Sequence, residues 1–177
     1  GFIGVGYMGY GIAKNILKDK NKLYVIANKN RKPIDKIVND GAVEINSFEE
    51  FSNKNLDALF MCVTNTPIAK SISEKISKIL DSKTIIIDVT THNKTGSIET
   101  EEIFKSNNIN YIECPVMGGP VQAEEGILGG IVGALLTGLF CVPILAGVEP
   151  GMEQVGIQFY GILLTIGWCG IGTFVIL

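Results

Sequence analysis

The last part of this sequence has almost no charge and no positive charge at all. All 15 Lys and Arg residues lie at or before Lys105, and after Glu125 the only charged residues are Glu149 and Glu153. No basic patch is present, so we expect no nucleic-acid partner. The uneven charge divides the chain into a near-neutral, soluble-looking domain at 1–126 and an apolar segment at 127–177.

Clustered cysteines and a leader segment are also missing. The chain has four cysteines, far apart and without a C-x-x-C pair, namely Cys62, Cys114, Cys141 and Cys169. We therefore expect isolated buried thiols and no metal site or disulfide. We expect no signal peptide, and the sequence begins inside an apolar run without an initiator Met. We interpret it as a fragment that lacks a few N-terminal residues.

Apolar runs and amphipathic stretches alternate along the first domain. The apolar runs predict strands at 2–5, 23–27, 42–45, 58–63, 84–89 and 110–114. Helical spacing of apolar residues predicts helices at 9–17, 33–39, 68–80 and 96–105, and Gly41 is placed to end the second of them. This alternation predicts an α/β fold, with a parallel sheet covered by helices on both faces.

Three glycines form the pattern G-x-G-x-x-G between the first predicted strand and the first predicted helix. Gly4 permits a tight turn, Gly6 lets a pyrophosphate approach the backbone, and Gly9 lets the helix pack closely on the strand. The helix start adds free N–H groups and the positive end of its dipole. A glycine-rich turn without a ligand is the alternative. The context favours a Rossmann-like dinucleotide site that uses Gly4, Val5, Gly6, Tyr7, Met8 and Gly9.

The end of the second predicted strand lacks the acid that commonly binds the ribose of NAD. An Asp or Glu about 20 residues past the glycines is typical of NAD enzymes. This chain has Asn28, Lys29 and Arg31 there. The two cations could pair with a 2′-phosphate, and Asn28 could donate a hydrogen bond to it. We therefore predict NADP over NAD, with a solvated turn that implies no cofactor choice as the alternative.

A series of ordered blocks resembles the β-hydroxyacid dehydrogenases, the family of 3-hydroxyisobutyrate and 6-phosphogluconate dehydrogenases. The blocks are 1–17, with Met8 inside the glycine motif, and 28–29, 62–64, 88–91, 115–119 and 123–128. The resemblance implies that Val63, Thr64 and Thr91 lie on the nicotinamide side of the cofactor. It also implies that Met117, Gly118 and Gly119 face the carboxylate of a small hydroxyacid substrate.

Two departures from this family concern its chemistry. Met117 replaces the family's substrate serine, and a thioether cannot donate a hydrogen bond to a carboxylate. The resemblance also implies a catalytic lysine on a later helix, but the chain has no lysine after Lys105. General acid catalysis is typically worth 10²–10⁴-fold in rate, so we expect no catalytic residue and no turnover in this chain alone.

Other ionisable residues have simpler interpretations. His92 is the only histidine and follows a predicted strand end, so a catalytic role is one alternative. We expect instead that it lies on the surface or behind the residues that contact the cofactor. Glu124 and Glu125 resemble a family helix start, which predicts carboxylates in the first turn of a helix.

The apolar segment contains two uncharged runs, 127–147 and 155–177, separated by a polar turn at 148–154. Each is long enough to cross a bilayer core, which takes about 20 helical residues. They predict a transmembrane helical hairpin, with a buried helix pair as the alternative. The Lys/Arg excess before them places the first domain in the cytoplasm, and the protein would be cytoplasmic altogether if the tail is an artefact.

The apolar segment also resembles part of another family. Residues 130–140 and 155–177 are similar to two helices of the ammonium transporters, but Gly126 stands where that family has a pore histidine. The stretch 129–134 fits both families, and we interpret it as the join of two coding sequences. The leading interpretation is an NADP-binding domain truncated before its catalytic helix. The alternatives are a membrane protein with a tethered nucleotide-binding module and a non-functional fusion fragment.

Overall fold

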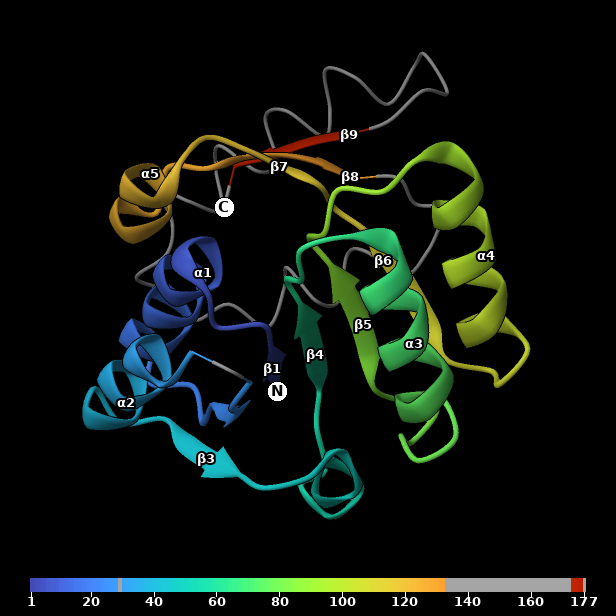
Figure 1. Ribbon diagram of the computed structural model, residues 1–177, viewed down its shortest axis with the longest axis horizontal. Coiled ribbons are helices and arrows are strands. Elements are labelled where there is room, and N and C mark those ends of the chain that lie inside the picture. Colours follow the sequence, from blue (N-terminus) through green and yellow to red (C-terminus); the bar gives the residue numbers. More distant parts are fainter. Residues whose placement is uncertain (29, 133–172, 177) are drawn as a thin grey trace.

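A parallel sheet forms the centre of the protein. The computed structural model describes residues 1–28, 30–132 and 173–176. Its six-stranded sheet has the order β3-β2-β1-β4-β5-β6, and every neighbouring pair is parallel (Figure 1). This arrangement confirms the predicted Rossmann-like fold. The strands are β1 (Phe2–Ile3), β2 (Tyr24–Ile26), β3 (Val43–Ile45), β4 (Ala58–Met61), β5 (Ile85–Asp88) and β6 (Asn110–Glu113).

Helices cover both faces of this sheet. In Figure 1, α1 and α2 lie together on one side, and α3 and α4 lie together on the other. Asn30, Asn65 and Asn93 cap α2, α3 and α4, because each side chain accepts a hydrogen bond from a first-turn N–H group. The bounds are α1 (Tyr7–Lys18), α2 (Arg31–Asn39), α3 (Thr66–Ile76), α4 (Lys94–Lys105) and a short 3-10 helix η1 (Phe48–Asn53).

Two apolar clusters, one for each face of the sheet, hold these layers together. Phe2 belongs to the cluster that includes Val25 and Ile37, whereas its neighbour Ile3 belongs to the cluster that includes Leu59 and Phe104. Successive side chains of a strand point to opposite faces, so short apolar strands without polar alternation bury both. The apolar runs in the sequence are therefore unbroken because helices cover both faces of the sheet.

The predicted strands and helices of the first domain are present with small shifts at their ends. Gly41 follows α2 with a φ of 117°, as expected for a residue that ends a helix. Two helices lie outside the four predicted ranges, namely the 3-10 helix η1 and the α-helix α5 (Pro120–Glu125), although a helix start was expected at Glu124 and Glu125 in the latter. Glu124 and Glu125 end this helix, so the expectation that they lie in a first turn was wrong. Gly126, with a φ of 74°, closes the helix after them.

The short helix α5 packs closely on α1. A Cβ atom built at Gly11 would lie 2.5 Å from the backbone carbon of Ala123. The Asn15 side chain donates a hydrogen bond of 2.7 Å to the Ala123 carbonyl. The glycine on α1 therefore lets the two backbones approach, and the Asn15 amide adds a second hydrogen bond to the Ala123 carbonyl, which also accepts from the Gly126 N–H group.

The described ends of the apolar segment are strands. β8 (Gly129–Val132) pairs antiparallel with both β7 (Val116–Met117) and β9 (Thr173–Ile176). The expected helices are therefore wrong at 129–132 and 173–176, because a short apolar run does not by itself distinguish strand from helix. The rest of the predicted hairpin, 133–172 and 177, lies outside the described residues. No helix in the described part of the chain is both long and apolar enough to cross a membrane.

Candidate functional site

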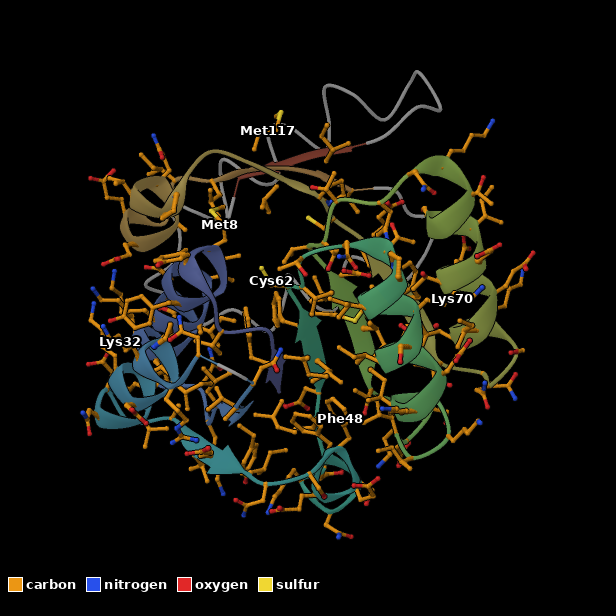
Figure 2. All side chains as sticks on the ribbon, viewed as in Figure 1. Met8, Lys32, Phe48, Cys62, Lys70 and Met117 are labelled. Atoms are coloured by element: carbon orange, nitrogen blue, oxygen red, sulfur yellow. The ribbon has the colours of Figure 1, made fainter. Side chains whose placement is uncertain are left out.

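The predicted cofactor residues gather at the carboxyl ends of three neighbouring strands. The glycine loop follows β1, Val63 and Thr64 follow β4, and Thr91 follows β5. β1 lies between β2 and β4, so the chain reverses its direction of progress through the sheet there. Ligands of open α/β sheets bind outside the carboxyl ends at such a point. Figure 2 shows Met8 and Cys62 near this edge.

Glycine is present at the three positions of the loop for different structural reasons. Gly4 has a φ of 96°, and a Cβ there would lie 2.0 Å from the Cys62 carbonyl oxygen. A Cβ at Gly9 would lie 2.1 Å from the Gly4 oxygen. Gly6 is different, because a Cβ there would meet nothing within 4 Å. Packing therefore does not require glycine at residue 6, whereas a phosphate that approaches the start of α1 would require it.

A groove of about 230 Å³ begins at this glycine loop. Lys36, on α2, lies with its ammonium group 4.1 Å from the centre of the Tyr10 ring. A hydrogen bond with Tyr10 raises the pKa of Lys36. The groove is lined by Gly6, Tyr7, Tyr10, Lys32, Pro33, Lys36, Pro120 and Glu124. It therefore presents two cations of α2, Lys32 and Lys36, beside the glycine loop.

Arg31, one of the predicted 2′-phosphate ligands, is already paired with two carboxylates. Its guanidinium donates hydrogen bonds to both oxygens of Glu44 and to Asp35, the latter at 2.8 Å. These hydrogen bonds raise the pKa of Arg31 above its ordinary value. Asn28 is exposed at the end of β2, and Lys29 lies outside the described residues. Lys32 and Lys36 were not among the predicted ligands, because Lys32 precedes the helix predicted at 33–39; in the observed α2 their spacing of four residues indicates a shared face.

The loops after β4 and β5 are aligned by the sheet. Met61 pairs with Asp88 in register, so Thr64 and Thr91 each lie three residues beyond a paired position. Both threonines are exposed at the sheet edge. The Val63 N–H group donates to the Thr90 hydroxyl over 3.1 Å and so joins the two loops. The structure therefore brings these two threonines to the edge that carries the glycine loop.

His92 is buried below this edge, so the alternative that placed it on the surface was wrong. Its side chain has no exposed area, and its Nε2 lies 2.8 Å from Asp88 Oδ2. Its Nδ1 lies 3.1 Å from the Thr66 hydroxyl, and the Tyr111 hydroxyl donates to the same Asp88 oxygen over 3.1 Å. Thr66 and Tyr111 had no signal in the sequence, because Tyr111 reaches Asp88 through the pairing of β5 with β6, and Thr66 reaches His92 from the start of α3.

The ionisation of this cluster follows from its burial and its charges. The hydrogen bond that His92 donates to the Asp88 carboxylate raises the pKa of His92, against the opposing effect of burial. Burial, with the Asp88 charge, raises the pKa of Tyr111 above its ordinary range. Burial also raises the pKa of Cys62 to about 11 and that of Cys114 to about 11. Cys114 is a buried free thiol and Cys62 a half-buried one, and their raised pKa values make them poor nucleophiles.

The predicted substrate residues lie on the segment that joins β7 to α5. Met117 is 48% exposed and pairs with Gly129, and Gly118 has a φ of 130°. The Gly119 N–H group donates to the Gln122 side chain over 3.0 Å. Figure 2 shows Met117 beyond the sheet edge that carries Met8 and Cys62. Over residues 1–28 and 30–132, no group of three or more potential metal ligands is present.

The parallel sheet, the glycine loop and the open start of α1 together define a Rossmann dinucleotide-binding domain. Residues 1–137 match the family described as the NAD binding domain of 6-phosphogluconate dehydrogenase. The match covers most of the chain, so the protein belongs to this family.

Curated relatives and solved structures agree with this family. The 2-(hydroxymethyl)glutarate dehydrogenase of Eubacterium barkeri is 24% identical over 163 residues, which cover 90% of this chain and 52% of that protein. The mitochondrial 3-hydroxyisobutyrate dehydrogenase of Drosophila melanogaster is 26% identical over 133 residues, or 75% of this chain and 41% of that one. The chain thus spans about half the length of these relatives.

Solved structures share the fold. A Mycobacterium tuberculosis 3-hydroxyisobutyrate dehydrogenase, solved with L-serine, has a TM-score of 0.70 at 19% identity and covers 75% of this chain and 45% of its own. Psf3, solved with NADP+ and 2-OPP, has a TM-score of 0.67 at 27% identity and covers 74% of this chain and 47% of its own.

The comparisons also concern the apolar segment. An alignment over 90% of the chain must continue past Val132, so similarity to a dehydrogenase extends into the part expected to resemble ammonium transporters. The family match likewise runs through residue 137. The ammonium transporter resemblance and the predicted membrane association therefore have no support.

Proposed function

We propose that this chain binds NADP(H) as the cofactor domain of an oxidoreductase that acts on a small hydroxyacid. One observation carries the proposal: Gly6 is a glycine that packing does not require, at the start of a helix that faces an open groove. A pyrophosphate approaching the backbone explains that glycine. Membership of the family supports a nicotinamide dinucleotide as the ligand. We keep the domain boundary at residue 126 as a prediction.

The proposed choice of NADP over NAD depends on positive charge near the end of β2. Asn28 and Lys29 remain candidates for the 2′-phosphate, as the sequence predicts. Arg31 is already paired with the carboxylates of Asp35 and Glu44, so it is less free to bind a phosphate. Lys32, in contrast, lines the groove that begins at Gly6. The structure of Psf3, solved with NADP+, supports the same choice. We propose that Lys32, with Lys29, receives the 2′-phosphate.

We propose binding rather than turnover as the activity of these 177 residues. The segment with Met117, Gly118 and Gly119 is the proposed substrate loop, and its side chains and backbone offer no general acid for a hydroxyl group. No lysine follows Lys105 to supply one. When bound, the cofactor would supply a hydride, and the chain would hold its phosphates and orient its nicotinamide.

The test replaces Gly6 with aspartate. Aspartate is a preferred residue at the first position before a helix, and Gly6 has a φ of −97° that suits it, so the melting temperature should be unchanged or higher. Its negative charge and volume should repel the pyrophosphate and weaken NADPH binding by about a hundredfold or more. A fluorescence titration with NADPH and NADH measures both affinities. Unchanged NADPH affinity in a folded Gly6→Asp variant would overturn the proposal.

A further inference from the structure

A buried histidine connects the two loops at the nicotinamide side of the proposed site. His92 follows β5 and makes two contacts in different directions, to Asp88 at 2.8 Å and to Thr66 at 3.1 Å. Thr66 is the first residue of α3, directly after the loop that follows β4. The side chain has no exposed area, so it cannot itself contact a bound cofactor. Its two ring nitrogens therefore join one loop to the other.

Asp88 organises the same connection from the strand side. Its Oδ1 accepts a hydrogen bond of 2.9 Å from the Thr90 N–H group, while its Oδ2 accepts from His92 and Tyr111. The Thr90 hydroxyl in turn accepts from the Val63 N–H group over 3.1 Å. The carboxylate thus fixes the backbone of one loop directly and reaches the other loop through His92 and Thr90. Buried networks of this kind hold a single arrangement when every member is paired.

We propose that His92 is a positioning residue for the nicotinamide end of the cofactor. It holds the loop at 62–66 against the loop at 89–93, so that Val63, Thr64 and Thr91 form one surface. The inference rests on the proposed function, because these three residues are its nicotinamide-side candidates. The adenine end depends on different parts of the chain, namely the glycine loop and α2.

Because the two ends of the cofactor contact different parts of the chain, a ligand without the nicotinamide distinguishes a positioning role of His92 from a purely structural one. Adenosine 2′,5′-bisphosphate carries the adenine end and the 2′-phosphate of NADPH but lacks the nicotinamide. If His92 positions only the loops after β4 and β5, its loss should weaken NADPH and spare the bisphosphate. A histidine that only stabilises the fold would affect both ligands alike or neither.

Three substitutions of His92 separate its two contacts. His92→Gln keeps a donor near the position of Nε2, which faces Asp88, whereas His92→Asn keeps one near Nδ1, which faces Thr66. His92→Leu removes both. We expect His92→Leu to weaken NADPH about tenfold, and His92→Gln to recover most of that loss, because a charge-assisted hydrogen bond is the stronger of the two contacts. Affinity for the bisphosphate should stay within about twofold throughout.

A matched control removes a different buried polar group, the hydroxyl of Thr100. Thr100 on α4 is fully buried and donates only to the Gly96 carbonyl of its own helix. Thr100→Val should leave the affinities for both ligands unchanged. Hydrogen exchange of the Val63 amide, measured without any ligand, is the second readout, and we expect it to be at least about tenfold faster in His92→Leu than in the unsubstituted chain.

The outcomes separate this inference from the proposed function. Binding of neither ligand by the unsubstituted chain would overturn the proposed function, and the inference built on it. Binding of both ligands, with equal weakening or no weakening in the His92 variants, would overturn the inference alone. Unchanged exchange at Val63 in His92→Leu and in His92→Gln would overturn it whatever the ligands do.

Discussion

The two halves of the cofactor edge are built by different means. The half formed by β1, α1 and α2 is made of backbone, with glycines where the chain must turn or admit a ligand, and exposed lysines beside a groove. The half formed by β4, β5 and β6 is held by a hydrogen-bonded cluster of the buried Asp88 and His92 side chains with the half-buried residues Tyr111 and Thr66. The comparison shows that one half depends on local conformation, whereas the other depends on side chains brought together from distant parts of the chain.

In the first half, a substitution at Gly4 should reduce the stability of the protein most. Gly4→Ala places a Cβ 2.0 Å from the Cys62 carbonyl oxygen, on a residue with a φ of 96°. We expect it to lower the free energy of unfolding by about 2–4 kcal/mol, which urea denaturation measures. Gly6→Ser is the matched control, because open space surrounds Gly6 and serine is a good residue before a helix. Equal stability of the two variants would mean that the loop is not built as described.

The second half should respond to pH through His92. The pKa of His92 is raised from its ordinary value of 6.5, so its contribution to stability is fully present below that value and is lost as the pH rises through the folded pKa. His92→Gln cannot take a proton. The free energy lost in this variant should therefore be larger at pH 5.5 than at pH 8.5, by about 1 kcal/mol.

Urea denaturation of both proteins at the two pH values tests this, since other titrating groups cancel in the difference. His92→Asn serves as the control for loss of the imidazole itself, and it should show the same pH trend as His92→Gln. A difference that is constant with pH would show that the Asp88 contact does not favour the charged imidazole.

A smaller effect should distinguish two neighbouring cations of the first half. Lys32 lines the groove at Gly6, whereas Arg31 is paired with Glu44 and Asp35. We expect Lys32→Ala to weaken NADPH about fivefold and to leave NADH within about twofold, as for an exposed charge pair. Arg31→Ala should change neither the affinity for NADPH nor the affinity for NADH. Titration at low salt measures both, and the opposite ranking would assign the 2′-phosphate to Arg31.

The sequence predicted the first half better than the second. Gly4, Gly6 and Gly9 could be assigned because a turn and a close approach restrict the residue type at fixed spacing. The apolar runs predicted the strands because a sheet covered on both faces leaves no polar alternation. Arg31 was a reasonable phosphate ligand by position, but its carboxylate partner Glu44 lies on another strand, which spacing does not reveal.

The second half and the apolar segment needed contacts that no local pattern contains. His92 is buried because Asp88 and Thr66 meet it across two loops. Glu124 and Glu125 end a helix because Gly126 closes it, which the resemblance to a family helix start did not indicate. The run from Gly129 to Val132 is a strand because β7 and β9 flank it, and an uncharged run alone does not determine a secondary structure.

The close contact between α1 and α5 also couples two segments that are far apart in the sequence. With six residues, α5 is too short to persist in water without tertiary support, and α1 supplies that support through Gly11 and Asn15. α1 itself requires β1 and the glycine loop in place. The position of Gly118 and Gly119, which lead into α5, therefore depends in part on the nucleotide loop, more than a hundred residues earlier in the chain.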